Sequence, residues 1–192
     1  MKDGFEATSR VVRVLEDMDI DYLVVGSLSS MAYGIPRSTK DADLVLSLKS
    51  GELSRFADAL GPEFELDPQG SFETVTGTMR YHLGVPSISF EIELFLLSDD
   101  AHDQARFERR QTIFSPQLES EAPIPTAEDV IVMKIRWAEI GKRGKDRDDV
   151  RDIIAVQGDD ALDWDYIHKW TAEHGTRKLL DEIRESIPPI DD

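Results

Sequence analysis

The stretch from Gly26 to Asp43, with the sequence GSLSSMAYGIPRSTKDAD, constrains the fold more than any other part of the chain. It follows the apolar run Tyr22–Val25, which is short enough to be a buried strand. Gly26 and Ser27 end that strand, because glycine permits a tight turn and serine is a good helix N-cap. The pattern therefore predicts a strand, a turn and then one or two helical turns over residues 29–33.

A second strand, predicted over residues 41–46, begins with two acidic residues at alternate positions. Side chains alternate along a strand, so Asp41 and Asp43 point to the same side. Two carboxylates held that close repel each other unless a cation or protons lie between them. The pattern indicates a divalent metal ion at these two residues.

A second acidic pair lies in the strand predicted over residues 87–97. Glu91 and Glu93 face one side of it, and Ile92 and Leu94 face the other. Glutamates in an otherwise apolar strand are costly unless they meet cations or water. Two interpretations stay open, a cation site and an edge strand whose acidic side is wet.

The remaining apolar periodicity and turn signals place the other elements along the chain. His82 falls in a hairpin strand and has no partner histidine nearby, so we expect a satisfied strand histidine rather than a metal ligand. Residues 115–125 are expected to be an acidic, proline-containing connection. Helices are predicted over 5–18, 52–60, 101–110, from 126 onward, 163–173 and 176–187, and strands over 64–66, 71–75, 78–85 and 111–114.

Length and composition limit the class of protein. A chain of 192 residues fits a core over residues 1–125 with a helical segment over residues 126–192 packed on it, as one compact unit. The chain has no cysteine, no signal-peptide apolar region and no apolar run of membrane-spanning length. We expect a soluble cytoplasmic protein with no membrane partner. The formal net charge of −17 argues against extended DNA binding.

One segment of this acidic chain, from Lys134 to Arg151, is basic: it contains seven basic and four acidic residues. Such a segment could hold a nucleoside triphosphate or the end of a nucleic acid. The alternative is a solvated helix and turn. The basic segment comes after a predicted helix start at Thr126, where Asp129 occupies the fourth position of a capping box.

Together these residues resemble the nucleotidyltransferase superfamily that includes DNA polymerase beta. The resemblance covers residues 20–155 and is closest to the branch of AbiEii-like toxins and aminoglycoside nucleotidyltransferases. It implies an α/β (α+β) nucleotidyltransferase fold, a mixed β-sheet flanked by helices with a C-terminal helical segment. The matching features are Gly26-Ser27 after a strand, the run Arg37-x-Thr39-x-Asp41-x-Asp43, the lysine helix from Pro125 to Lys134, and the Lys-Asp-x-x-Asp helix start between Gly144 and Val150.

The resemblance also implies roles for individual residues. Glu93 matches the third family carboxylate best and Glu91 second, and whether Glu93 is a metal ligand, a general base or both stays open. The ion would be Mg²⁺, or Mn²⁺. The implied catalytic and metal residues are Asp41, Asp43 and Glu93, the nucleotide-binding residues are Gly26, Ser27, Arg37 and Lys134, and the secondary candidates are Glu91, Thr39, Lys145, Asp146 and Asp149.

The implied activity is metal-dependent transfer of a nucleoside monophosphate from an NTP to a hydroxyl. The sequence does not identify the acceptor, and three classes stay open: an RNA 3′ end, a protein side chain and a small molecule. The AbiEii-like branch would make the protein a toxin acting on tRNA or protein, with an antitoxin partner. Two other classes stay open, a non-catalytic member of the fold that binds nucleotide or a partner, and an interaction protein with no ligand.

Overall fold

The computed structural model describes residues 1–49 and 51–188, and the chain divides into two units by its internal packing. The sheet unit comprises residues 1–28 and 38–125. The helical unit comprises residues 29–37 and 126–192, of which 189–192 lie outside the described residues. The short segment 29–37 thus joins the helical unit, which the sequence does not indicate.

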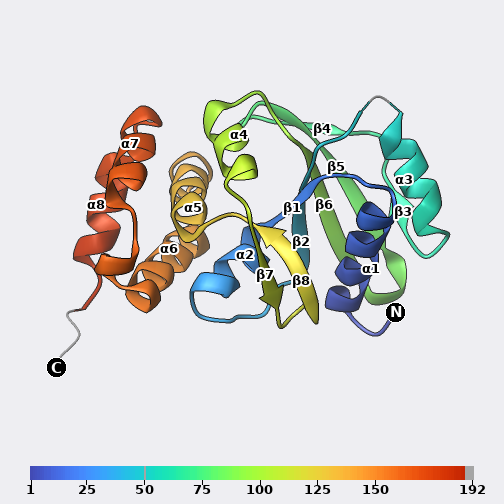
Figure 1. Ribbon diagram of the computed structural model, residues 1–192, viewed down its shortest axis with the longest axis horizontal. Helices are drawn as coiled ribbons and strands as arrows, with labels where there is room; N and C mark the ends of the chain where they lie inside the picture. Colours follow the sequence, from blue (N-terminus) through green and yellow to red (C-terminus); the bar gives the residue numbers. More distant parts are fainter. Residues whose placement is uncertain (50, 189–192) are drawn as a thin grey trace. The chain divides into compact units, whose positions relative to one another are not determined.

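A mixed sheet forms the centre of the sheet unit (Figure 1). Its order is β1-β2-β6-β5-β3, and β4 pairs with β5 as well. β2 and β6 run parallel, whereas the other neighbouring strands of this sheet are antiparallel. The strands are β1 (Tyr22–Val25), β2 (Asp41–Leu46), β3 (Glu65–Leu66), β4 (Ser71–Glu73), β5 (Thr78–Val85) and β6 (Phe90–Leu96).

Helices α1 (Gly4–Asp17) and α3 (Glu52–Leu60) pack against each other, and α1 contacts β2 and β6 (Figure 1). Leu44, Ile92 and Leu94 are fully buried, as their alternation with the acidic residues requires. Burying such side chains supplies most of the free energy that holds a sheet to its helices. The predicted first helix is confirmed, and it packs on the sheet.

The opposite side of the strands carries a smaller apolar cluster. Leu23, Val25 and Val45 pack there with Phe107 of α4 (Ala101–Glu108). Val25 pairs with Asp43 across the strands, so this cluster continues along the face that holds the carboxylates. The apolar contacts therefore fix the strands on which the acidic residues stand.

The expectation of a plain connection over residues 115–125 was wrong. β8 (Ser120–Ile124) lies there and pairs antiparallel with β7 (Gln111–Ser115). Ala122 and Ile124 are buried, but Pro123 and the acidic neighbours mask this alternation in the sequence. A proline lacks the N–H for a ladder bond and is tolerated at sheet edges, which is why it is not a reliable sign of a loop.

The helical unit is built from four long helices and the last turns of α2. Thr126 caps the first of them, because its side chain accepts a hydrogen bond from the Asp129 N–H as predicted. Ile135, Ile153 and Ile167, from three different helices, are fully buried. The helices are α5 (Ala127–Gly141), α6 (Gly144–Gln157), α7 (Trp164–Glu173) and α8 (Arg177–Glu185).

Two boundaries differ from the sequence predictions. α2 (Gly26–Tyr33) begins directly after β1, so that Ser27 lies inside the helix instead of preceding it. Gly26 makes this abrupt junction with a φ of 62°, which L side chains rarely adopt. β6 begins at Phe90, because residues 86–88 form a 3₁₀ turn that starts with a proline.

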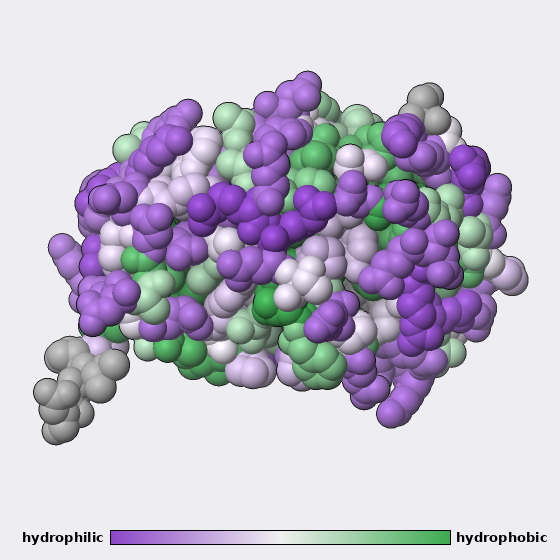
Figure 2. Space-filling model, viewed as in Figure 1, coloured by the Kyte–Doolittle hydropathy of each residue, from purple (hydrophilic) through white to green (hydrophobic). Residues whose placement is uncertain are grey.

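The surface is mainly hydrophilic on the face shown in Figure 2, where apolar areas are small and separate. This agrees with the 32% of the residues that are charged. Within residues 1–49 and 51–188, none of the helices has both the length and the hydropathy needed to cross a bilayer.

Candidate functional site

Four carboxylates stand in register at the start of the two parallel strands. Asp41 of β2 pairs with Glu91 of β6, and Asp43 pairs with Glu93. Neighbouring strands lie about 4.8 Å apart, and paired residues point to the same face. The structure therefore brings both acidic pairs together on one side of the sheet, although the sequence separates them by about fifty residues.

Asp43 lies directly against Gly26 at the junction of β1 and α2. A Cβ atom on Gly26 would fall 1.8 Å from Asp43 Oδ2, which no side chain could tolerate. The glycine is thus required for two reasons, its positive φ and the close approach of the carboxylate. Ser27 follows in the first turn of the helix and is buried.

Asp41 is oriented by the threonine two residues before it. The Thr39 hydroxyl donates a hydrogen bond of 2.6 Å to Asp41 Oδ1. Because one oxygen accepts this bond, the orientation of the carboxylate is fixed and its other oxygen keeps its lone pairs for a ligand. This gives Thr39 the place of a positioning residue for Asp41.

Glu93 has a basic neighbour on β5. Arg80 Nη1 lies 3.3 Å from Glu93 Oε1 and 3.4 Å from Oε2, and both side chains are partly exposed. On the same strand, His82 Nδ1 lies 2.8 Å from Glu91 Oε1. Each glutamate of β6 therefore contacts one basic side chain of β5.

The three predicted catalytic carboxylates each meet a different partner: Asp41 meets Thr39, Asp43 lies over Gly26, and Glu93 meets Arg80. Among the described residues, the side chains whose ligand atoms converge within 4.8 Å are instead His82, Glu91 and Glu93. The predicted trio thus shares one sheet face without forming that tight a group. Repulsion between like charges favours such an arrangement.

Lys134 lies in the helical unit, where α5 and α6 pack together. Its ammonium group lies 2.9 Å from Asp146 Oδ1 and 2.9 Å from Asp149 Oδ2. All three side chains are buried, so the ion pairs are weakly screened and hold the lysine in one place. The two aspartates thus fix the position of the Lys134 ammonium group.

Arg37 contacts the same aspartate through two hydrogen bonds. Its Nε donates to Asp149 Oδ1 at 2.9 Å and its Nη2 to Oδ2 at 3.0 Å. Burial alone would raise the pKa of Asp149, but the hydrogen bonds and charges of Arg37 and Lys134 outweigh it and hold the pKa below its ordinary value. Asp149 therefore links the two basic residues predicted to bind nucleotide.

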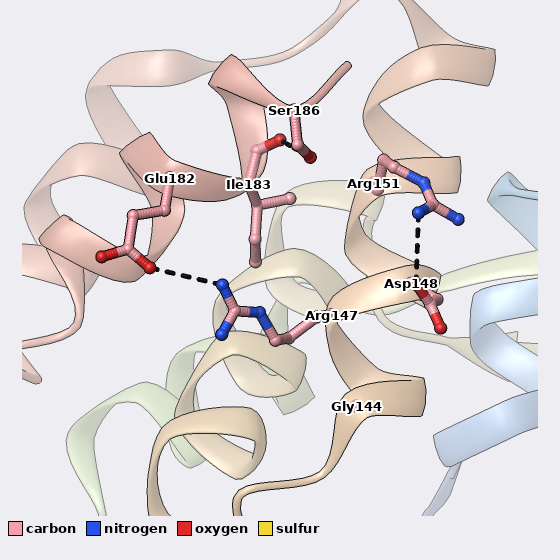
Figure 3. Close-up of a pocket in the computed structure, with 7 residues that line it drawn as sticks. All are labelled: Gly144, Arg147, Asp148, Arg151, Glu182, Ile183 and Ser186. Carbon is pink, nitrogen blue, oxygen red and sulfur yellow. Dashed lines mark hydrogen bonds and ion pairs between the residues drawn. The ribbon is translucent and has the colours of Figure 1, made fainter.

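Lys145 is exposed on α6. The same helix and α8 form a pocket of about 250 Å³, drawn in Figure 3. Its arginines are paired with carboxylates, Arg147 with Glu182 at 3.3 Å and Arg151 with Asp148 at 3.2 Å. These pairs neutralise the charge that a phosphate would need, and none of the predicted site residues lines the pocket.

Sequence reasoning missed Arg80, whereas His82 is the satisfied strand histidine that it expected, paired with Glu91. Both lie on β5, and alternate positions of a strand share one face. Their pairing partners Phe95 and Glu93 show that this face is the one bearing the glutamates. The alternation was readable in the sequence, but the neighbouring strand was not.

The chain is similar to several solved structures, although no protein-family model and no curated protein sequence matches it. The antibiotic-resistance factor ANT(2″)-Ia in complex with adenylyl-2″-tobramycin gives a TM-score of 0.60 at 10% identity, covering 91% of this chain and 98% of that one. A nucleotidyltransferase-like protein from Paracoccidioides brasiliensis gives 0.53 at 17% identity, covering 96% and 94%.

A third neighbour is a lincosamide antibiotic adenylyltransferase bound to lincomycin, with a TM-score of 0.50 at 12% identity, covering 76% of this chain and 93% of that one. At such identities a likeness shows the fold. It extends over nearly the whole length of these proteins and agrees with the β1-α2-β2 arrangement that carries the acidic residues. The chain therefore shares the fold of these nucleotidyltransferase structures.

Proposed function

We propose that the protein is a metal-dependent nucleotidyltransferase, which transfers a nucleoside monophosphate from an NTP to a hydroxyl acceptor. The observation that carries this proposal is the register of β2 and β6, which pairs Asp41 with Glu91 and Asp43 with Glu93 on one face. The fold adds support, because Gly26 lies directly against Asp43 at the start of a helix.

The donor set suits a hard divalent cation. Asp41, Asp43 and Glu93 offer only oxygen atoms, which Mg²⁺ and Mn²⁺ prefer. The register of β2 and β6 gathers four carboxylates on this face, where Arg80 contacts Glu93. When bound, such ions neutralise phosphate charge and acidify an acceptor hydroxyl.

The chain's own groups orient and hold the reactants in this proposal. Thr39 fixes the Asp41 carboxylate through its hydroxyl, and Gly26 lets Asp43 approach the start of α2. Backbone N–H groups at a helix start are suited to phosphate oxygens, which assigns Gly26 and Ser27 to the triphosphate. The sequence resemblance assigns Lys134 and Arg37 to nucleotide binding, and Asp149 holds both within the helical unit. Positioning and charge supply most of the rate enhancement in phosphoryl transfer.

We infer that the acceptor is a small cationic molecule in preference to an RNA. A chain with a net charge of −17 repels polyanions and attracts polycations, which favours an amine-bearing small molecule. Two of the structural neighbours are described with adenylyl-tobramycin and with lincomycin. A toxin acting on tRNA or protein, with an antitoxin, is the alternative that the sequence resemblance implies.

Labelled NTPs test the activity directly. The full chain is incubated with α-labelled NTPs and Mg²⁺ or Mn²⁺, with tobramycin, lincomycin, tRNA or a cell extract as acceptors in separate reactions. We expect a labelled acceptor and one pyrophosphate per transfer. The double variant Asp41→Asn plus Asp43→Asn should abolish transfer, and Asp58→Asn on the exposed side of α3 is the matched control. Transfer that survives the double variant overturns the proposal.

One observation favours a second candidate, a non-catalytic member of the fold that binds nucleotide or a partner. Both basic residues assigned to the triphosphate already contact Asp149, and Glu93 already contacts Arg80. Calorimetry separates the candidates. Nucleotide binding that is unaffected by Mg²⁺ and releases no pyrophosphate supports the binding module, whereas affinity that rises with Mg²⁺ supports the enzyme.

A further inference from the structure

His82, Glu91 and Glu93 form a group that the transferase proposal does not use as a unit. His82 pairs with Glu93 across β5 and β6, and Glu91 is the diagonal neighbour two residues earlier on β6. All three side chains therefore lie on one face of the sheet. One ligand atom from each lies within 4.8 Å of the other two.

We propose that these three residues bind a divalent transition-metal ion of the Zn²⁺, Co²⁺ or Ni²⁺ class. One imidazole nitrogen with two carboxylates is a donor set that such ions accept, whereas Mg²⁺ prefers oxygen alone. The chain contains no cysteine, so the nitrogen of His82 is the donor that distinguishes this site from the oxygen-only aspartates. The proposal does not rest on the transferase activity.

The distances leave little to rearrange. Four-coordinate Zn²⁺ with bonds of about 2.0 to 2.2 Å sets its ligand atoms roughly 3.4 Å apart. His82 Nδ1 is 2.8 Å from Glu91 Oε1, so a small rotation of these two side chains admits the ion. The strands that carry them are held by a continuous ladder from Arg80 to Val85, which keeps the backbone positions fixed.

The electrostatics of the face favour a cation at this place. Glu91 and Glu93 stand beside Asp41 and Asp43, while Arg80 contacts Glu93 from one side. The Arg80 contacts are long, at 3.3 and 3.4 Å, and a carboxylate has lone pairs for more than one partner. His82 is partly exposed and Glu91 is more exposed still, so an ion can reach them from solvent.

Calorimetric titration of the full chain with ZnCl₂, after treatment with a chelator and without nucleotide, tests the site. We expect one equivalent to bind. Loss of a residue that only orients a metal ligand commonly lowers metal affinity by about 10- to 100-fold. Loss of a direct ligand should cost at least as much, so His82→Gln and Glu91→Gln should each lower Zn²⁺ affinity at least tenfold. His168→Gln on α7 and Glu121→Gln on β8 are matched controls and should bind as the wild type does.

A spectroscopic readout keeps the test independent of folding defects. On adding Co²⁺, the ring resonances of His82 should broaden more than those of the other three histidines. Asp43→Asn should keep Zn²⁺ binding while losing nucleotidyl transfer, which separates the two proposals. Weak binding of several equivalents, binding that His82→Gln does not alter, or no binding in the folded protein would each overturn the site.

Discussion

Gly26 and Asp43 are mutually dependent: the carboxylate occupies the space in which any side chain at position 26 would stand. We predict that Gly26→Ala destabilises the protein by at least about 1 to 2 kcal/mol, the usual cost of a left-handed alanine, and displaces Asp43. Chemical denaturation measures the first effect. A fall in Mg²⁺-dependent nucleotide affinity measures the second.

Gly77→Ala is the matched control, since Gly77 has a φ of 72° and a Cβ there meets nothing within 4 Å. It carries the same backbone strain without the contact to Asp43. It should therefore lower stability but leave nucleotide affinity unchanged. If both variants bind nucleotide equally well, the approach of Asp43 to Gly26 has no role in binding.

The hydrogen bond between Thr39 and Asp41 leads us to predict that its loss weakens metal binding. Thr39→Val removes the 2.6 Å hydrogen bond while keeping the shape of the side chain. We expect Mg²⁺ affinity to fall about 10- to 100-fold, as for other residues that orient a ligand, with little loss of stability. Thr39→Ser should retain most of the affinity. Titration of Mn²⁺ followed by electron paramagnetic resonance checks this, and equal affinities in all three proteins would contradict it.

Arg80 is expected to offset the repulsion between the carboxylates of β2 and β6. Arg80→Met should lower stability in EDTA by about 0.5 to 1 kcal/mol, because the ion pair with Glu93 is partly exposed. Millimolar Mg²⁺ should restore more stability to this variant than to wild type. Arg10→Met, which removes the exposed ion pair with Glu63, is the control. A Mg²⁺ response equal in both variants would contradict the prediction.

The ion pairs of Asp149 should make the free energy of unfolding fall at acidic pH. Its pKa is lowered in the folded state, so its contribution is present above the unfolded pKa, about 3.9, and is lost as pH falls through the folded value. Asp149→Asn should therefore weaken the protein at pH 7 and flatten its stability curve below about pH 4. Urea unfolding at several pH values measures both. A curve parallel to wild type would show that Asp149 is not responsible.

Lys134→Met probes the same network from the other side. It leaves Asp146 and Asp149 buried without their shared ammonium group. Breaking a buried pair in this way typically costs about 3 to 5 kcal/mol. Arg37→Met removes a more exposed partner of Asp149 and should cost clearly less. Equal losses in urea unfolding would show that burial of Lys134 is not decisive.

Much of the fold could be read from local chemistry. The apolar run before Gly26 and the alternating residues after Asp41 predicted β1 and β2 within a residue. Pro123 hid the alternation of β8, and the 3₁₀ turn at residues 86–88 shortened the strand that bears the glutamates. In the first case hairpin pairing with β7 outweighed the proline signal, and in the second a local turn that begins with Pro86 delayed the start of the strand.

The sequence by itself determined which carboxylates share a strand face, because alternation places Asp41 with Asp43 and Glu91 with Glu93. Only the tertiary structure decided how the two pairs meet and which bases join them. The parallel register of β2 and β6, the contact of Arg80 with Glu93, and the convergence of His82 with Glu91 depend on strand order. Strand order follows from packing the whole apolar surface, which no local pattern encodes.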